Sequence, residues 1–107
     1  MIVVTTPEIS GREIAEVLGL VRGNTIRARH VGRDIQAKIR NLTGGEVHEY
    51  TKMMAEAREQ AVDRMLEDAA AVGADAIVGV RFQTCEVMNG AAEMLCYGTA
   101  VRLVPRD

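Results

Sequence analysis

Three sulfur-bearing side chains, Cys85, Met94 and Cys96, lie near one another in the C-terminal part of the sequence. The dipeptide Asn89–Gly90 between them is typical of a tight β-hairpin turn. With this turn, Cys85 is expected to face Met94, and Cys96 to lie diagonally from Cys85 on the same sheet face. Thiolate and thioether groups are ligands for soft ions such as Cu(I) or Zn(II). The pattern therefore predicts a candidate soft-metal site.

Packing explains the same three residues without a metal ion. Cysteine and methionine are common buried side chains. Neither a CxxC motif nor a histidine pair completes a coordination set in this sequence. We therefore favour two reduced thiols packed at a subunit interface, with no cofactor, and keep the soft metal ion as the alternative.

Enzyme chemistry finds little support in the remaining polar residues. The two histidines, His30 and His48, belong to no nucleophile–base pattern, and no P-loop or HExxH motif occurs. Glu86 and Glu93 are expected to face each other near the hairpin tip, where like charges need solvation or a basic partner. A binding or scaffolding protein without catalysis is the favoured interpretation. The alternative is an enzyme whose site is assembled between subunits from such acids.

Arg58 is the unusual residue of the long amphipathic segment that contains it. On a helical wheel it falls within the apolar arc, beside Met65 and Ala69. Its planar guanidinium group suits a bidentate carboxylate partner, and Asp34 is the first choice. This ion pair would be structural, holding a short helix to the long one. Snorkelling of Arg58 to the edge of the apolar arc is the alternative.

The elements that position these residues follow from hydrophobic periodicity. The longest is a helix over 46–72, whose apolar residues share one side and whose Gly73 suits the position just after a helix end. Short strands are predicted over 2–6, 14–21 and 25–30, with a break near Gly23–Asn24, and a short helix over 33–42. The hairpin strands are predicted over 76–88 and 91–104.

The hairpin has two unlike faces. The long helix is expected to cover the face that carries Val78, Val80, Phe82 and Thr84 opposite Val101, Thr99, Tyr97 and Leu95. A helix of about 40 Å and strands of about 43 Å exceed the diameter of about 34 Å expected for a compact domain of this size. The chain should therefore be an elongated plate whose second face is covered by another subunit. The predicted interface residues on that face are Ile77, Gly79, Gly98 and Ala100.

Composition limits the class of protein. The 107 residues predict a single domain over 1–107, and the net charge of −2 with few aromatic residues argues against a nucleic-acid partner. No apolar run is long enough for a membrane span. Two cysteines do not form a secreted disulfide framework, so a cytoplasmic location is expected. Basic residues concentrate over 22–40 and acidic ones over 46–75, which favours contact between oppositely charged faces.

The order and spacing of several short motifs resemble those of the YbjQ-like family, small uncharacterised proteins whose family name refers to heavy-metal binding. The resemblance rests on "RD" at 33–34, "GG" at 44–45, Tyr50, "AR" at 57–58, "GADAIVGV" at 73–80 and "YGTAV" at 97–101. It implies an α+β fold with a dodecin-subunit-like β-α-β-β core and extra strands, in which one long helix packs on a twisted antiparallel sheet. It also implies a ring-shaped homopentamer. It implies no established activity.

Overall fold

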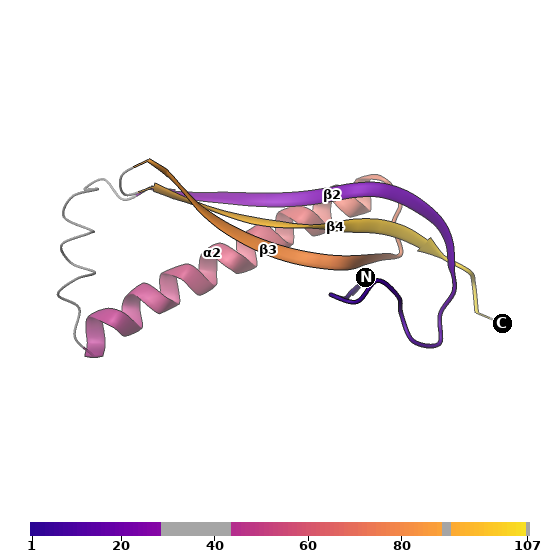
Figure 1. Cartoon of the computed structure of the whole chain (residues 1–107), viewed down its shortest axis with the longest axis horizontal. Helices are drawn as coiled ribbons and strands as arrows, with labels where there is room; N and C mark the ends of the chain where they lie inside the picture. The colour runs from indigo at the N-terminus through magenta and orange to yellow at the C-terminus, as the bar shows by residue number, and fades with distance from the viewer. Residues whose placement is uncertain (29–43, 89–90, 107) are drawn as a thin grey trace.

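The computed structural model describes residues 1–28, 44–88 and 91–106 (Figure 1). Its elements are β1 (Ile2–Val3), β2 (Ile14–Ala28), α2 (Gly44–Ala71), β3 (Ala76–Met88) and β4 (Ala91–Leu103). The strands form one mixed sheet in the order β1-β3-β4-β2, in which β1 is parallel to β3 and the other neighbours are antiparallel. The predicted α+β class, with one long helix on a sheet, is confirmed.

The strand β2 is longer than the sequence pattern predicts. Gly23 and Asn24 keep their places in the ladder, opposite Cys96 and Leu95, so the predicted break between two strands is wrong. The reason is that Gly23 lies where α2 packs directly on the sheet, because a Cβ atom there would collide with the backbone at Ala61 and Met65. The helix predicted over 33–42 and the turn residues Asn89 and Gly90 lie outside the described residues.

The helix α2 is held to the sheet by a stripe of mostly small side chains. Ala57, Ala61, Met65 and Ala69 recur every four residues and are at most 1% exposed, as expected for one face of an amphipathic helix. The helix ends in a Schellman motif at Gly73, which has a φ of 75°. There the backbone nitrogens of Gly73 and Ala74 donate to the carbonyl oxygens of Ala70 (3.1 Å) and Ala69 (3.1 Å).

Two β-bulges in β3 overturn the predicted pairing of the hairpin. Met88 faces Ala91, but the register shifts by one residue between Glu86 and Met88, so that Cys85 lies opposite Glu93 rather than Met94. A second shift follows between Val78 and Arg81, where Gly79 has a φ of 62°. Each extra residue reverses the side to which the following side chains point relative to the partner strand.

The helix consequently covers the face of β4 that we predicted to be the subunit interface. Ile77 and Ala100 are 0% exposed in the core beneath α2, together with Cys96. Gly98 is also buried, and a Cβ atom there would lie 2.7 Å from Cγ2 of Ile77. The assignment of Ile77, Gly98 and Ala100 to an exposed face was therefore wrong. Small residues allow α2 to approach the sheet closely, so they suit the core of the same subunit.

A second, smaller core lies on the opposite face, at one end of the sheet. Val78, Val101 and Leu103 are buried there under Ile2, Val4, Ile9 and Ile14. The N-terminal segment is held along β3 by backbone hydrogen bonds, from Val4 N to the Ile77 oxygen (2.9 Å) and from Val80 N to the Val4 oxygen (3.0 Å). Val78 and Val101 thus lie on the face that α2 does not cover, contrary to the sequence-based expectation.

The molecule is an elongated plate of 57 × 25 × 17 Å with a radius of gyration of 17.3 Å, against about 13 Å for a compact domain of about 100 residues. The elongated shape predicted from the element lengths is confirmed. Beyond the N-terminal segment, the face opposite α2 carries exposed apolar side chains, with Leu20 68% and Ile26 56% exposed. No helix in the described part of the chain is long and apolar enough to cross a membrane.

Candidate functional site

The three predicted soft ligands are not brought together. Cys85 is exposed and lies opposite Glu93, on the face away from α2. Met94 and Cys96 are buried on the other face, within the core beneath α2. The bulge between Glu86 and Met88 causes this separation, since without it Cys85 would lie opposite Met94. Cys85 therefore has no part in a site with the other two sulfur atoms of the set.

Cys96 instead meets a sulfur atom that the sequence pattern did not single out. Its thiol donates a hydrogen bond to Sδ of Met65 at 3.5 Å, and both residues are 0% exposed. Gly23 lies opposite Cys96 in the sheet, and the backbone of α2 rests on Gly23. This close approach places Met65 over Cys96. Met65 was predicted only as a member of the apolar stripe, because periodicity shows which side of a helix is buried and not which strand residue it meets.

Burial also changes the acid–base behaviour of Cys96. Desolvation raises the pKa of its thiol above the ordinary value of 9.0, because the charged thiolate is disfavoured away from water. The thiol is therefore protonated at neutral pH, and by itself it is a poor nucleophile.

Two threonines flank Met94 on the face beneath α2. Thr84 lies opposite Met94 in β3 and donates its hydroxyl to Sδ of Met94 at 3.4 Å. Thr25 lies opposite Met94 in β2 and is 3% exposed. Its hydroxyl oxygen is buried and has no hydrogen-bond partner within the described part of the chain. Buried hydroxyl groups normally have a partner, so the Thr25 hydroxyl is an exception in the described part of the chain.

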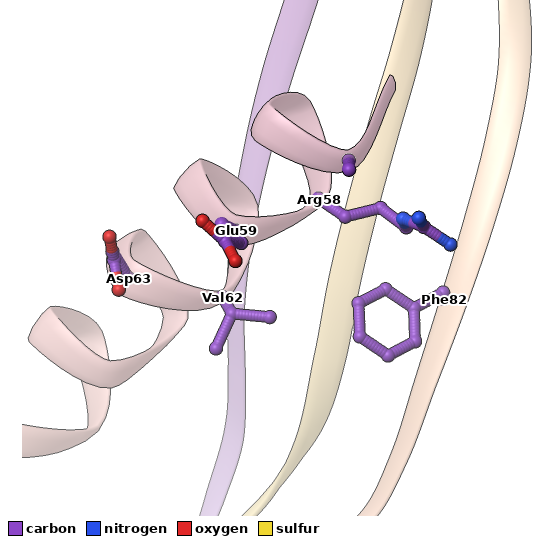
Figure 2. A pocket seen from close by; sticks show the side chains of 6 residues that line it. Arg58, Glu59, Val62, Asp63 and Phe82 are labelled. Atoms are coloured by element: carbon purple, nitrogen blue, oxygen red, sulfur yellow. The ribbon is translucent and has the colours of Figure 1, made fainter. Parts of the chain in front are cut away.

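A groove lies between α2 and β3, because α2 packs mainly on β2 and β4 (Figure 2). Its volume is about 700 Å³, and it is lined by Ala55, Arg58, Glu59, Val62, Asp63 and Phe82. Figure 2 shows the Arg58 side chain extended from α2 towards β3, beside the Phe82 ring, with Val62 facing the ring. Phe82 is 49% exposed. The groove combines an apolar floor with charged groups on its helical side.

Arg58 is exposed at this groove and makes no ion pair with any of the described residues. We predicted a partly buried guanidinium group, and in the isolated chain that burial is not observed. Its proposed partner Asp34 lies outside the described residues, so the ion pair stays a prediction.

Glu86 and Glu93 do not face each other. Glu86 lies opposite Ala92 and Glu93 lies opposite Cys85, which places the two acids on opposite faces of the hairpin. Glu93 accepts a hydrogen bond from Nδ2 of Asn24 at 3.1 Å. The predicted pairing of these two acids was wrong for the same reason as the predicted pairing of Cys85 with Met94. The bulge in β3 lies between Glu86 and the turn, so it shifts Glu86 by one residue relative to β4.

The two edges of the sheet differ. At the β2 edge, α2 satisfies two outer backbone groups: Oδ2 of Asp68 accepts from Arg22 N at 3.0 Å, and Nη1 of Arg64 donates to the Asn24 oxygen at 2.6 Å. At the other edge, β1 pairs with Ala76 and Ile77, and the backbone hydrogen bonds between the N-terminal segment and β3 extend as far as Val80, beyond which the Arg81 side chain donates to the Thr5 oxygen at 2.8 Å. From 81 to 86, β3 has no second strand among the described residues.

Comparison with known proteins agrees with this fold. A profile of the YbjQ family described as "Putative heavy-metal-binding" matches residues 1–104. A UPF0145 protein of Methanosarcina acetivorans is 56% identical over 99% of this chain and 100% of its own length. One from Vibrio campbellii is 52% identical over 97% of this chain and 100% of its own.

A solved structure shows the same fold at low sequence identity. A protein of unknown function from the DUF74 family of Pediococcus pentosaceus superposes with a TM-score of 0.65 at 17% identity, covering 97% of this chain and 98% of that one. The match of the family profile and the identity to the UPF0145 relatives agree over nearly the full chain. The chain described here belongs to the YbjQ-like family of uncharacterised UPF0145 proteins.

Proposed function

We propose that this protein is a cytoplasmic homo-oligomeric binding or scaffolding protein without catalysis of its own, and that the oligomer is a ring-shaped pentamer. The observation that carries the proposal is the edge of β3 over 81–86, which has no neighbouring strand in the described part of the chain and runs beside the groove containing the half-exposed Phe82. An unpaired strand edge is a template for another chain. A groove with an apolar floor next to it adds pockets for alternate side chains.

The occupant of this edge is a second copy of the chain. The exposed Leu20 and Ile26 on the face opposite α2 supply apolar surface of a kind that monomers seldom leave open. The β2 edge is already occupied by Arg64 and Asp68. We infer that the edge of β3 meets a surface of its neighbour other than the β2 edge. Such a head-to-tail contact closes into a ring when the rotation between neighbours divides a full turn, and the ring-shaped pentamer is what the resemblance to the YbjQ-like family implies.

A reducing compartment agrees with the state of the thiols. Both cysteines are free, and Cys85 is exposed. An exposed free thiol is uncommon in secreted proteins, where disulfides form and persist. The alternative of an enzyme with a site built from Glu86 and Glu93 loses its basis within one subunit, because the two acids lie on opposite faces.

The proposal is tested with native mass spectrometry and light scattering of the purified protein. A pentamer is expected for the wild type, and Phe82→Arg should shift it to monomer, because the new charge would be buried at the contact. Since Phe82 is 49% exposed in the single chain, the variant subunit should still fold, as circular dichroism would show. Glu67→Gln, on the exposed side of α2, is the control. A wild-type monomer at micromolar concentration would refute the proposal.

A further inference from the structure

We propose that Cys96, Met65 and Met94 form a buried site for one monovalent soft metal ion, Cu(I) or Ag(I). The site lies within a single subunit, so the proposal stands independently of the assembly. Two of its sulfur atoms are already in contact, since the Cys96 thiol lies 3.5 Å from Sδ of Met65. They come from a strand and a helix that are far apart in the sequence. Gly23 fixes their approach, because the backbone of α2 rests on it opposite Cys96.

Met94 supplies the third sulfur atom. It lies two residues before Cys96 on the same face of β4, is 5% exposed and belongs to the same core cluster. Its sulfur accepts a hydrogen bond from the Thr84 hydroxyl at 3.4 Å, so the thioether already acts as an electron-pair donor in the free protein. One thiolate with one or two thioethers is a donor set that selects soft ions over hard ones.

Charge balance selects a monovalent ion. The core beneath α2 contains Cys96 and Met65, both 0% exposed, in apolar surroundings. An uncompensated charge is costly in such a place. One Cys96 thiolate and one Cu(I) sum to zero, and the thioethers are neutral. A divalent ion such as Zn(II) would leave one positive charge buried without a partner.

Binding releases one proton. The Cys96 S–H bond breaks, the proton leaves to solvent, and the sulfur lone pair forms the bond to the metal ion. No electron is transferred. Affinity should therefore rise with pH over the range in which Cys96 is protonated in the free protein.

The orphan hydroxyl of Thr25 is an independent observation that points to a ligand here. It lies opposite Met94 and diagonally from Cys96 on the same face, buried and without a partner among the described residues. A protonated thiol is a weak acceptor, whereas a thiolate accepts strongly. Deprotonation of Cys96 on metal binding would give this hydroxyl its missing acceptor. Outer hydrogen bonds of this kind are common around metal sites.

The experiment titrates reduced protein with Cu(I) in the absence of oxygen, against a chromophoric Cu(I) chelator. One retained Cu(I) per subunit is expected, with sulfur-to-copper charge-transfer absorption in the ultraviolet. Cys85→Ser removes the exposed thiol on the opposite face and is the matched control, expected to bind as the wild type does. Cys96→Ala should abolish retention, and the near-isosteric Met65→Leu should weaken it about tenfold or more.

Two further measurements keep the test decisive if Cys96→Ala folds poorly. X-ray absorption of the Cu(I)-loaded Cys85→Ser protein should show two or three sulfur neighbours and no nitrogen or oxygen neighbour. Thr25→Val should lower the affinity several-fold without altering the circular dichroism spectrum. The proposal is overturned if the wild type retains no Cu(I) against the chelator, if Cys85→Ser abolishes retention, or if Zn(II) binds as tightly as Cu(I).

Discussion

Gly23 of β2 lies directly against the backbone of α2 at Met65. There is no room for even a methyl group between the strand and the helix at this point. This contact sets the distance of the helix from the sheet, and with it the place of the Met65 sulfur atom.

Gly23→Ala should therefore destabilise the protein strongly. The added methyl group collides with backbone at Ala61 and Met65 rather than with a side chain that can rotate away. We expect a loss of about 3 kcal/mol or more in the free energy of unfolding, measured by urea denaturation. Gly11→Ala is the comparison, since its Cβ would meet nothing within 4 Å but its φ is 77°, which costs about 1 kcal/mol. Equal losses would contradict the close contact.

Removing both side chains that cover the β2 edge should expose that edge. In Arg64→Ala/Asp68→Ala, the Arg22 nitrogen and the Asn24 oxygen lose their partners on α2. We expect each single change to lower stability by about 1 kcal/mol. The double variant should form large aggregates that grow with concentration, seen by light scattering. Unchanged scattering would show that Arg64 and Asp68 do not protect the edge.

The stability of the Arg58→Ala variant distinguishes an exposed guanidinium group from one that is buried in an ion pair. As an exposed side chain at the groove without an ion pair among the described residues, Arg58 should contribute less than about 1 kcal/mol to stability. A loss of about 3 kcal/mol would instead indicate the predicted ion pair with Asp34, held away from water in the complete assembly. Asp34→Asn tests the same pair from the other side, and should then give a similar loss.

The two thiols should differ in reactivity. Cys85 is exposed and Cys96 is 0% exposed. A thiol reagent at neutral pH should therefore modify one cysteine rapidly and the second only on the timescale of unfolding. Cys85→Ser should abolish the rapid phase. Two rapid phases of equal amplitude would contradict the burial of Cys96.

Stability should fall at alkaline pH because of Cys96. Its pKa is raised by burial above the ordinary 9.0, so the folded protein keeps a proton that the unfolded chain releases. This contribution to stability is complete below the unfolded pKa and is lost as pH rises through the folded pKa. In a Cys85→Ser background, the free energy of unfolding should decline above the ordinary thiol pKa of 9.0 more steeply than in Cys85→Ser/Cys96→Ala. Parallel curves would rule this out.

Periodicity and turn chemistry predicted the elements that matter most. The helical spacing of apolar residues in α2 and the Asn-Gly dipeptide between β3 and β4 were sufficient to place the helix and the hairpin strands. The pairing across the hairpin failed because bulges add single residues. Gly79 carried a signal for one of them, since an isolated glycine within a strand suggests a bulge. The bulge near Val87 has no comparable signal in the residue types.

The prediction of the subunit interface was wrong for a related reason. Ala100 and Gly98 were assigned to a subunit interface because the predicted register placed them on the face away from the helix, yet small residues are also what a closely packed helix requires. Ala100→Arg would therefore disrupt folding of the subunit and would not report on assembly. The contact between Cys96 and Met65 depends on how α2 crosses the sheet. The spacing of apolar residues along the sequence does not predict this crossing.

The unlike edges of the sheet give the subunit a direction. At β2, the backbone nitrogen of Arg22 and the backbone oxygen of Asn24 are already engaged by the subunit's own helix, which disfavours the pairing of a further strand at this part of the edge. The engaged groups at the β2 edge thus oppose continued growth of the sheet by hydrogen-bonded strands from successive molecules. In the assembly that we propose, this asymmetry would leave the edge of β3 over 81–86 for a second copy and would disfavour the continued sheet growth that leads to fibrils.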